Sequence, residues 1–510
     1  MGSENKKQIA KNTAALYFRM LLTMVVGLYT SRIVLSTLGV VDYGIYNIVG
    51  GIVILFSFFN NAMFSAIQRF LNVEIAKNDH FQLNKIFSVS MTVQISIAIT
   101  VFVLSETIGL WFVNTQLNLP TERMIAVNWV YQFSIMTFLI NIFLAPYEAT
   151  ILANEHMSFF AYASIIDVST KLLIVFLLQY IGHDSLIVYA ALTASLSFLF
   201  LAIYRIYCTK KFDYCYFHYS RDKILYRQLM SFSGWSLLGG IANVGKSQGV
   251  NIILNIFCGV VVNAAVGIAN QVSTALNNFV FNFQLAFNPQ IVKSYATNER
   301  DYFMQLIFQT AKLSYFLLFF ISLPVLLNTE IILDIWLKDV PDYTVMFCQL
   351  SIIVILIDTI SGPLWISIQA VGIIKKYQIV ISTVLIMNVP LSYLSLMLGF
   401  PPYSVLWINL IVGIVALIVR LRFLRKLVDL SIKKFFKDVL FKIAFVTLIS
   451  LPLPLVIKYF TTGYFGAGIS LIISITSVGL AVFFVGLKSN ERELLRTTLF
   501  KFLKKMWFPK

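Results

Sequence analysis

Charged side chains are scarce in this sequence of 510 residues: only 12% are Asp, Glu, Lys or Arg, whereas 59% are hydrophobic. A soluble domain carries about 25% charged residues, and no soluble core can bury so much apolar surface. A soluble globular class is therefore excluded. The composition instead predicts an all-α polytopic membrane protein, which grows by adding apolar helices rather than by enlarging one core.

Cysteine is scarce as well, with residues only at positions 208, 215, 258 and 348. They form no CxxC pair and show no spacing that would indicate a disulfide framework. Cys208, Cys215 and His218 lie close together in the sequence, but their spacing matches no common zinc pattern. Unpaired cysteines at a helix end and in a loop are the preferred interpretation, and we expect neither a metal nor a cofactor.

Long apolar runs, by contrast, are abundant. A membrane-spanning helix needs about 20 mainly apolar residues, and we predict fourteen such spans. They lie at roughly 14–38, 44–68, 85–113, 123–147, 158–181, 186–208, 231–257, 260–288, 304–327, 345–370, 377–399, 402–424, 439–460 and 463–487. Because this number is even, both termini are expected on the same side of the membrane.

Lys and Arg are distributed unevenly between the predicted loops. Only Arg123, Lys338 and Lys458 fall in loops on the side opposite the N-terminus, whereas most of the 39 basic residues lie on the N-terminal side. The positive-inside rule makes the basic side cytoplasmic, so both termini are predicted to be cytoplasmic. This asymmetry explains the net charge of +16 without a nucleic-acid partner. The basic amphipathic segments 420–438 and 491–510 are expected to lie on the anionic inner leaflet.

The second half of the sequence echoes the first at a separation of roughly 220 residues. The segment LSTLGVVDYGIYNIV resembles LNIFCGVVVNAAVGIAN, with a shared Gly-Val-Val between two spans. Pro146 and Ala153 in PYEATILANEHMSFF match Pro363 and Ala370 in PLWISIQAVGIIKKY. The common order of these matches along the chain indicates an internal repeat of six spans.

Six spans are an even number, so both copies would have the same topology, related by an axis along the membrane normal. We therefore predict two parallel six-helix lobes, at 1–208 and 231–424, joined by a cytoplasmic linker at 209–230. An amphipathic connector with two appended helices follows at 425–487, and a basic cytoplasmic tail at 488–510. Two parallel lobes around a central cavity are typical of alternating-access transporters, which are not enzymes because no bond is made or broken.

Ionisable residues inside the predicted spans are the candidate functional residues, because a charge near the bilayer centre is costly and usually faces a cavity or a partner. The candidates for substrate binding are Arg19, Arg32, Lys171, Lys246 and Lys312, and the candidates for ion coupling are Asp167 and Asp358. The surplus of cations favours an anionic substrate, and a guanidinium group matches phosphate geometry. Cationic drugs would instead require unpaired acids.

The stretch from Ala14 to Gly39, which contains the first span, carries an arginine toward each end. Arg19 and Arg32 lie close enough to these ends for their side chains to reach the headgroups. On a straight helix they would point about 140° apart, so such a helix cannot aim both at one narrow cavity. Either Gly27 marks a bend, or only one arginine faces the lumen, with Arg32 as the first choice.

The remaining candidates also have structural interpretations. Lys171 follows Asp167 by four residues, so the two side chains can neutralise each other on one helix face. Lys246 lies near mid-span among glycines, which permit close helix packing or a broken segment. Asp358 lies just before Pro363, where a helix can kink, and is either a counter-ion for Lys246 or a carboxylate that binds H⁺ or Na⁺.

Residues 12–77, with the motifs LYTSRIV, LGVVDYGIYN and SAIQRF, resemble the N-terminal region of the Wzx-type polysaccharide flippases. These belong to the multidrug/oligosaccharidyl-lipid/polysaccharide exporter superfamily. The resemblance implies a V-shaped, alternating-access flippase of the bacterial inner membrane, which moves undecaprenyl-pyrophosphate-linked oligosaccharides to the periplasmic leaflet for O-antigen or other lipopolysaccharide biosynthesis. It also implies coupling to H⁺ or Na⁺, and a polysaccharide polymerase and a chain-length regulator as partners. Arg19 and Arg32 match the first-helix arginines of the family by location only.

Three rival classes stay open on the sequence alone. A drug exporter of the same superfamily shares the fold, but it would need an acidic rather than a cationic interior. A major-facilitator transporter would carry a glycine-containing basic loop after its second span, and QRFLNVEIAKNDHFQLNK contains no glycine. A membrane glycosyltransferase or polymerase would need larger outer loops with acidic or histidine residues, whereas the first outer loop is only GVVDYG.

Overall fold

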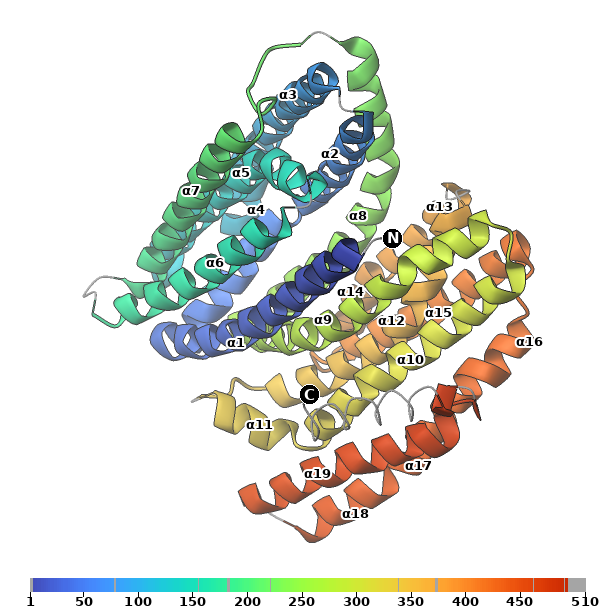
Figure 1. Cartoon of the computed structure of the whole chain (residues 1–510). Coiled ribbons are helices and arrows are strands. Elements are labelled where there is room, and N and C mark those ends of the chain that lie inside the picture. The colour runs from blue at the N-terminus through green and yellow to red at the C-terminus, as the bar shows by residue number, and fades with distance from the viewer. Residues whose placement is uncertain are drawn as a thin grey trace, which may run out of the picture. The chain divides into compact units, whose positions relative to one another are not determined.

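The computed structural model is helical, without strands, in the part of the chain that it describes (Figure 1). The described residues are 3–77, 79–154, 156–180, 184–220, 222–337, 339–371, 375–461, 463–489 and 491–493. Within them, eleven helices are long and apolar enough to cross a membrane. The prediction of an all-α, multi-pass membrane protein is therefore confirmed.

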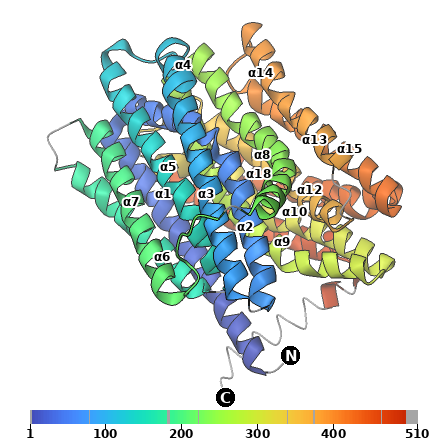
Figure 2. The same ribbon diagram turned by 90° about the horizontal axis from the view of Figure 1, so that it is seen from above.

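The N-terminal part of the chain forms a bundle of long helices. These are α1 (Ser3–Ile54), α2 (Ser57–Lys77), α3 (His80–Leu104), α4 (Leu110–Thr115), α5 (Met124–Ala153), α6 (Met157–Leu178) and α7 (Ser185–Lys211), with a π-helical turn at Ser105–Gly109 and a 3-10 turn at Thr121–Arg123. Helix α5 packs along α7, and α1 packs along α6, as both views show (Figures 1 and 2). The apolar faces of α1, α5 and α7 meet in a core that includes Ile48, Val130, Tyr131 and Ala190. This core holds together three of the helices that line the candidate site.

The rest of the chain continues with helices of similar length and several shorter ones. They are α8 (Lys223–Cys258), α9 (Val260–Ala296), α10 (Arg300–Leu327), α11 (Thr329–Trp336), α12 (Thr344–Val371), α13 (Lys375–Ile386), α14 (Asn388–Met397), α15 (Ser404–Val428), α16 (Ile432–Phe435), α17 (Phe441–Ser450), α18 (Pro452–Phe460) and α19 (Gly463–Ala481), with π-helical turns at Phe436–Leu440 and Val482–Gly486. Helix α19 packs against α10, α17 and α18. The three predicted spans outside the eleven are also helical: 44–68 lies in α1 and α2, 231–257 in α8 and 260–288 in α9.

Contacts divide the chain into two compact units, each described separately below. The first unit comprises Met1–Gln271, Trp336–Thr344 and Gln378–Ile408, and the second comprises Val272–Ile335, Val345–Tyr377 and Asn409–Lys510. The predicted lobes, 1–208 and 231–424, are defined by the sequence repeat and not by contacts. Their boundaries, and that of the linker between them, stay predictions. The greater part of the predicted basic tail, 494–510, lies outside the described residues.

The two copies of the Gly-Val-Val segment share an unusual backbone conformation. Gly39 interrupts α1 with φ 77° and ψ 170°, and Gly259 ends α8 with φ 76° and ψ −174°. Glycine adopts these angles freely, whereas residues with a Cβ atom are strained there. In each copy of the repeat the first helix is therefore interrupted at the corresponding glycine, Gly39 or Gly259. This interruption separates the first two predicted spans of the copy.

The second pair of matched segments is also structurally alike. Pro146 lies inside α5 and Pro363 inside α12. In each helix a hydroxyl four residues later donates to the proline carbonyl: Thr150 Oγ1 at 2.8 Å and Ser367 Oγ at 2.7 Å. The backbone continues as a helix past both prolines. These shared details support the internal repeat.

The repeated glycines give a direct test of this backbone argument. We expect Gly39→Ala and Gly259→Ala each to lower the free energy of unfolding by about 1–2 kcal/mol, because a Cβ atom strains the positive φ. Gly27→Ala is the control, since Gly27 is helical and a Cβ there has open space around it. Thermal unfolding of the purified protein in one detergent would compare the three. Equal melting temperatures for all three variants would contradict the prediction.

Candidate functional site

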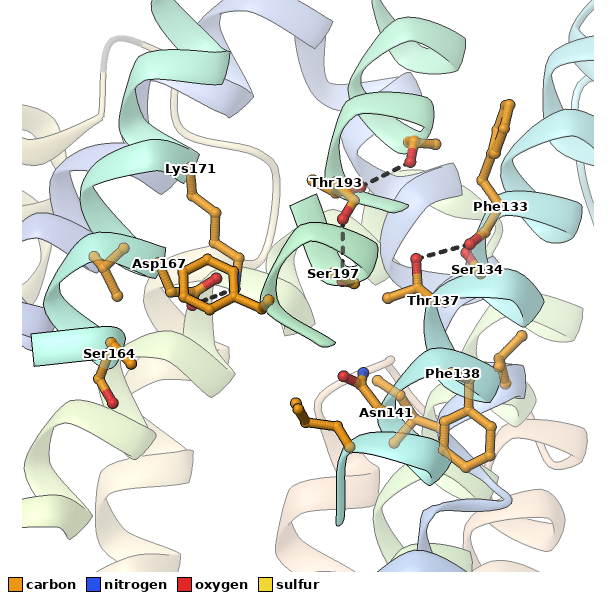
Figure 3. Close-up of a pocket in the computed structure, with 18 of the residues that line it drawn as sticks. Phe133, Ser134, Thr137, Phe138, Asn141, Ser164, Asp167, Lys171, Thr193 and Ser197 are labelled. Atoms are coloured by element: carbon orange, nitrogen blue, oxygen red, sulfur yellow. Dashed lines mark hydrogen bonds and ion pairs between the residues drawn. The ribbon is translucent and has the colours of Figure 1, made fainter. Parts of the chain in front are cut away.

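A cavity of about 500 Å³ lies within the first unit, between α1, α5, α6 and α7 (Figure 3). Its wall combines aromatic rings, hydroxyl and amide groups, and three carboxylate or ammonium groups. The aromatic residues are Tyr46, Phe133, Phe138, Phe160, Tyr189, Phe200 and Tyr204; the other polar residues are Ser134, Thr137, Asn141, Ser164, Thr193 and Ser197; the carboxylate and ammonium groups belong to Glu148, Asp167 and Lys171. This mixture is typical of a site for a polar organic molecule with apolar faces.

An ion pair on α6 forms one wall of the cavity. Lys171 Nζ lies 2.7 Å from Asp167 Oδ2, one helical turn away (Figure 3). The side chains are 44% and 30% exposed, respectively, so neither charge is sealed in the core. An ammonium group has three N–H donors, and Lys171 can therefore donate to a ligand as well as to Asp167.

The hydroxyl groups around the cavity use their protons within their own helices and can accept hydrogen bonds from a ligand. Thr137 Oγ1, Ser134 Oγ and Ser197 Oγ each donate to the backbone carbonyl four residues earlier, at 2.8, 2.7 and 3.1 Å. Thr193 Oγ1 donates at 2.9 Å to its own helix in the same way. Because a hydroxyl has one proton and two lone pairs, these oxygens remain able to accept. The cavity wall thus favours a ligand rich in hydrogen-bond donors.

Two tyrosines link α1 to α7 at the cavity. The rings of Tyr46 and Tyr189 lie 5.0 Å apart between centroids, a separation at which aromatic pairs attract each other. Phe133 and Phe138 of α5 line the cavity beside Thr137 and Asn141 (Figure 3). Apolar ring faces therefore alternate with polar groups along α5.

Glu148 is a cavity residue that the sequence analysis missed. The predicted fourth span, 123–147, ends one residue before Glu148. The structure extends α5 to Ala153, because the chain stays helical through Pro146 and Thr150 bonds its carbonyl. Glu148 is thereby brought inside the helix and lines the cavity. The hydroxyl four residues after the proline is the sequence signal that marks this continuation.

Arg32 of the first helix is not among the residues that line this cavity. Arg32 lies on α1 with its side chain exposed, and the side chain of Arg19 lies outside the described residues. Helix α1 keeps helical angles at Gly27 and departs from them at Gly39. The backbone is therefore not broken at Gly27, and a bend of the helix at Gly27 stays a prediction. That one arginine faces the lumen stays a prediction.

The other predicted residues are distributed over both units. Lys246 lies on α8 of the first unit and is partly exposed. Asp358 lies on α12 of the second unit, where its Oδ1 is 3.4 Å from the position that a Cβ atom on Gly413 would occupy. Of the seven predicted site residues, the described structure brings only Lys171 and Asp167 into the cavity. The predicted cationic surplus is not found in this cavity, which has two carboxylates and one ammonium group.

Lys312 lies in a second, charged cavity of about 650 Å³ within the second unit. Its side chain is 2% exposed, and its Nζ donates to Glu491 Oε2 at 2.6 Å. Lys488, three residues before Glu491, pairs with Asp438 at 2.8 Å. These two ion pairs attach the segment that follows α19 to the helices around this cavity.

A second ion-pair cluster joins the ends of three helices that line the first cavity. The guanidinium group of Arg123 bonds the Asp42 carboxylate at 3.0 and 2.6 Å and the Asp184 carboxylate at 2.7 and 3.0 Å. Asp184 also caps α7 by accepting from the Leu186 N–H at 3.1 Å. Burial raises the pKa of Asp184, but the hydrogen bonds and charge of Arg123 outweigh it, so its pKa lies below the usual value. The cluster holds α1, α5 and α7 together beside the cavity.

A metal site finds no support in the residues that the structure describes, where no group of three His, Cys, Asp or Glu side chains converges. Cys208 and Cys215 are buried and have free thiols. The Cys208 Sγ lies 3.7 Å from the Tyr147 carbonyl oxygen. These two cysteines therefore pack where α5 meets α7 and the following loop.

The chain matches no family model, and no curated protein matches it by sequence. Solved structures do match. The lipid II flippase MurJ, in an inward closed conformation, superposes with a TM-score of 0.65 at 14% identity, over 92% of this chain and 98% of that chain. An inward-facing multidrug resistance transporter of the MATE family gives a TM-score of 0.61 at 12% identity, over 81% and 94%. The chain has the fold of the MOP-superfamily transporters.

Another transporter with the MOP fold, from Pyrococcus furiosus, superposes with a TM-score of 0.60 at 13% identity, over 82% of this chain and 96% of that chain. It is described as having a binding pocket of reverse polarity that suggests a different function. At such low identities the likeness establishes the fold and leaves the substrate to be argued from the residues. The fold is the one expected for the superfamily from the sequence, and it does not distinguish the Wzx-type family from the other families of that fold.

Proposed function

We propose that this protein is a flippase, which moves undecaprenyl-pyrophosphate-linked oligosaccharides from the cytoplasmic to the periplasmic leaflet of a bacterial inner membrane. The observation that carries the proposal is the cavity of the first unit, whose aromatic rings and hydrogen-bond acceptors suit a sugar. The fold supports it, because the lipid II flippase covers 92% of this chain and the MATE transporter 81%. The flippase covers more of this chain than the MATE transporter does, and the additional length is roughly that of two membrane spans.

In the proposed mechanism the cavity binds the glycan and the membrane keeps the lipid tail. Sugar hydroxyls donate to the oxygens of Ser134, Thr137 and Ser197, while the rings of the lining cover the apolar sugar faces. Lys171 donates to an anionic group of the headgroup, since ammonium groups bind phosphate by charge and hydrogen bonding. Arg32 and Lys246 are proposed to neutralise the pyrophosphate. Rocking of the two lobes then exposes the headgroup on the other side, and no covalent bond changes.

The proposal includes the expected setting of the protein. Both termini lie in the cytoplasm, which accounts for the predominance of Lys and Arg on one side. The flipped oligosaccharide is then the substrate of a polysaccharide polymerase under a chain-length regulator. Asp358 remains a proposed coupling residue for H⁺ or Na⁺.

A multidrug transporter is the second candidate, and one observation favours it. Glu148 places a carboxylate in the cavity, and an acid without a cationic partner is what a cationic drug would require. A multidrug resistance transporter of the MATE family has the same fold. The two candidates differ in what accumulates when the protein is lost.

The first test of the proposal replaces the cavity ammonium. We expect Lys171→Met to reduce surface polysaccharide roughly tenfold in a strain that depends on this protein, because a charge-assisted hydrogen bond contributes about 1.5–3 kcal/mol. The measurement is surface polysaccharide, together with lipid-linked oligosaccharide retained in the cytoplasmic leaflet, at equal protein levels. Lys210→Met is the control, since Lys210 is exposed at the end of α7.

A companion variant separates binding from the loss of the ion pair. Lys171→Met combined with Asp167→Asn removes both charges, so no unpaired carboxylate is left behind. If this double variant and Lys171→Met both export polysaccharide normally, Lys171 has no role in substrate binding. If deletion of the protein leaves polysaccharide intact and raises sensitivity to cationic drugs, the flippase proposal is wrong and the drug transporter is favoured.

A further inference from the structure

A polar stripe lies along one face of α10, at the end where this helix begins. Asp301, Gln305 and Gln309 follow one another at intervals of four residues, and Lys312 lies three residues further on, so the four side chains share one helix face. All four line the charged cavity of about 650 Å³ in the second unit. A cavity of this size is typical of a site for a small polar group or molecule.

This cavity lies at one end of three candidate membrane spans. Arg300–Leu327 and Ile432–Phe460 begin beside it, and Gly463–Gly486 ends just before Lys488 and Glu491, which line its wall. A membrane-spanning helix ends near the lipid headgroups. A lipid of the adjacent leaflet therefore carries its headgroup at the depth of this cavity.

The segment 431–441, which supplies one wall of the cavity, has the features of an interfacial segment. Phe436 and Phe441 are 60% and 57% exposed, and Lys433 and Lys437 beside them are exposed as well. Exposed apolar rings next to lysines are typical of a segment that lies in the membrane interface. This wall therefore also indicates that the cavity lies among lipid headgroups.

Two ion pairs neutralise four of the seven charged side chains in the cavity wall. Lys312 Nζ lies 2.6 Å from Glu491 Oε2, and Lys488 Nζ lies 2.8 Å from Asp438 Oδ2. These four residues already have partners of opposite charge. The three charged residues that remain decide which ligand charges fit.

The remaining three are Asp301, Asp429 and Lys434, which are all exposed at the cavity wall. Within the described residues, the side chains of Asp301 and Lys434 make no hydrogen bond or ion pair. Asp429 lies 3.6 Å from Arg300, but these side chains are 89% and 61% exposed, and such a pair contributes little. The wall thus offers both carboxylates and an ammonium group, and a ligand with charges of both signs would use them all.

We propose that this cavity binds a phosphoethanolamine headgroup, as carried by phosphatidylethanolamine in the adjacent leaflet. The phosphate accepts from the Lys434 ammonium and from the Ser431 hydroxyl, whose oxygen itself accepts from the Lys434 backbone N–H at 3.3 Å. The headgroup ammonium donates to the carboxylates of Asp301 and Asp429 in charge-assisted hydrogen bonds. The acyl chains stay in the membrane. This lipid is bound and not transported, so the site does not depend on the proposed flippase function.

The test compares lipids that differ only in the headgroup. The purified full-length protein in detergent is titrated with phosphatidylethanolamine, phosphatidylcholine or phosphatidylglycerol of identical acyl chains, and native mass spectrometry measures the bound lipid. Phosphatidylcholine keeps both charges but has no N–H donor, and phosphatidylglycerol has no cation. We expect phosphatidylethanolamine to bind about tenfold more tightly than either, because the others lack its charge-assisted hydrogen bonds.

Single variants assign the two halves of the headgroup. Asp301→Asn and Asp429→Asn should each bring the affinity for phosphatidylethanolamine toward that for phosphatidylcholine, and asparagine tolerates the positive φ of 57° at position 429. Lys434→Gln should weaken the binding of both lipids, since both carry the phosphate. Asp213→Asn and Lys433→Gln are the matched controls, because they neutralise exposed residues that do not line the cavity.

Equal binding of the three lipids by the wild type would overturn the site, and this comparison needs no variant to fold. A preference for phosphatidylethanolamine that survives in both Asp301→Asn and Asp429→Asn, at unchanged melting temperature, would also overturn it. Free phosphoethanolamine, added as a competitor, distinguishes the source of the headgroup. If it binds as tightly as the lipid, the ligand is a soluble compound and the lipid assignment is wrong; weak binding of the free compound beside tight binding of the lipid supports the assignment.

Discussion

Glu491→Gln is expected to lower the free energy of unfolding by about 3–5 kcal/mol, because it removes one partner of a buried ion pair. Lys312 is 2% exposed and Glu491 11%, and their charged groups are 2.6 Å apart. Glu491 Oε2 also accepts from the Lys488 backbone N–H at 2.8 Å. The variant would leave the Lys312 ammonium without its counter-ion in a site that water hardly reaches. Thermal unfolding of the purified protein measures the loss.

Two further variants control this prediction. Glu493→Gln removes an exposed carboxylate two residues away, and surface changes of this kind shift stability by less than about 0.5 kcal/mol. Glu491→Gln combined with Lys312→Met removes both charges, so it should recover most of the stability lost by Glu491→Gln alone. A melting temperature of Glu491→Gln equal to that of Glu493→Gln would mean that the ion pair contributes nothing.

The same pair predicts an acid-dependent loss of stability. Burial raises the pKa of Glu491, but the hydrogen bond and charge of Lys312 outweigh it, so its folded pKa lies below the usual value. A depressed pKa means that the folded state binds the proton less tightly than the unfolded chain does. The stabilisation is therefore complete above about pH 4.5, near the unfolded pKa, and is lost as the pH falls through the folded pKa. Glu491→Gln should lack this part of the acid transition.

The helices of this protein could be predicted from its sequence because hydropathy and span length are local properties. The segment 44–68 illustrates the limit: it is one apolar run, yet the structure divides it between α1 and α2. The Lys171–Asp167 contact could also be predicted from the sequence, because residues four apart on a helix are neighbours in any fold. The local sequence pattern was therefore enough to predict the helices and the contacts between residues of one helix.

Contacts between distant segments could not be predicted in the same way. Lys312 and Glu491 are 179 residues apart in sequence, and Lys312 was instead assigned to the substrate path, a prediction that no observation yet tests. Glu148 was missed for a different reason: the predicted span ended at residue 147, while the backbone of α5 accommodates Pro146 and continues to Ala153. Tertiary packing decided the first case and is not visible in a periodic pattern, whereas in the second case the Thr150 hydroxyl was a local signal.

Arg123→Ala is expected to lower the free energy of unfolding by about 2 kcal/mol and to impair transport. The guanidinium group makes four hydrogen bonds to two carboxylates that lie 81 and 61 residues away in sequence. Bidentate charge-assisted bonds are among the stronger contacts in proteins, although partial exposure of all three side chains reduces their contribution. Without Arg123, Asp42 and Asp184 would repel each other, and the part of α1 that follows Gly39 would lose its attachment to α7.

Arg123→Lys separates the geometry of this cluster from its charge. One ammonium group cannot bond two carboxylates in a bidentate manner, so the lysine should recover only part of the stability. The pKa of Asp184 is held below its usual value by Arg123, so this contribution is complete above about pH 4 and is lost as the pH falls through the folded pKa. Arg123→Ala should abolish that acid dependence, and the tyrosines Tyr46 and Tyr189 at the α1–α7 contact should become more accessible. If Arg123→Lys matches the wild type in melting temperature and in export, charge alone holds the cluster and its bidentate geometry is unimportant.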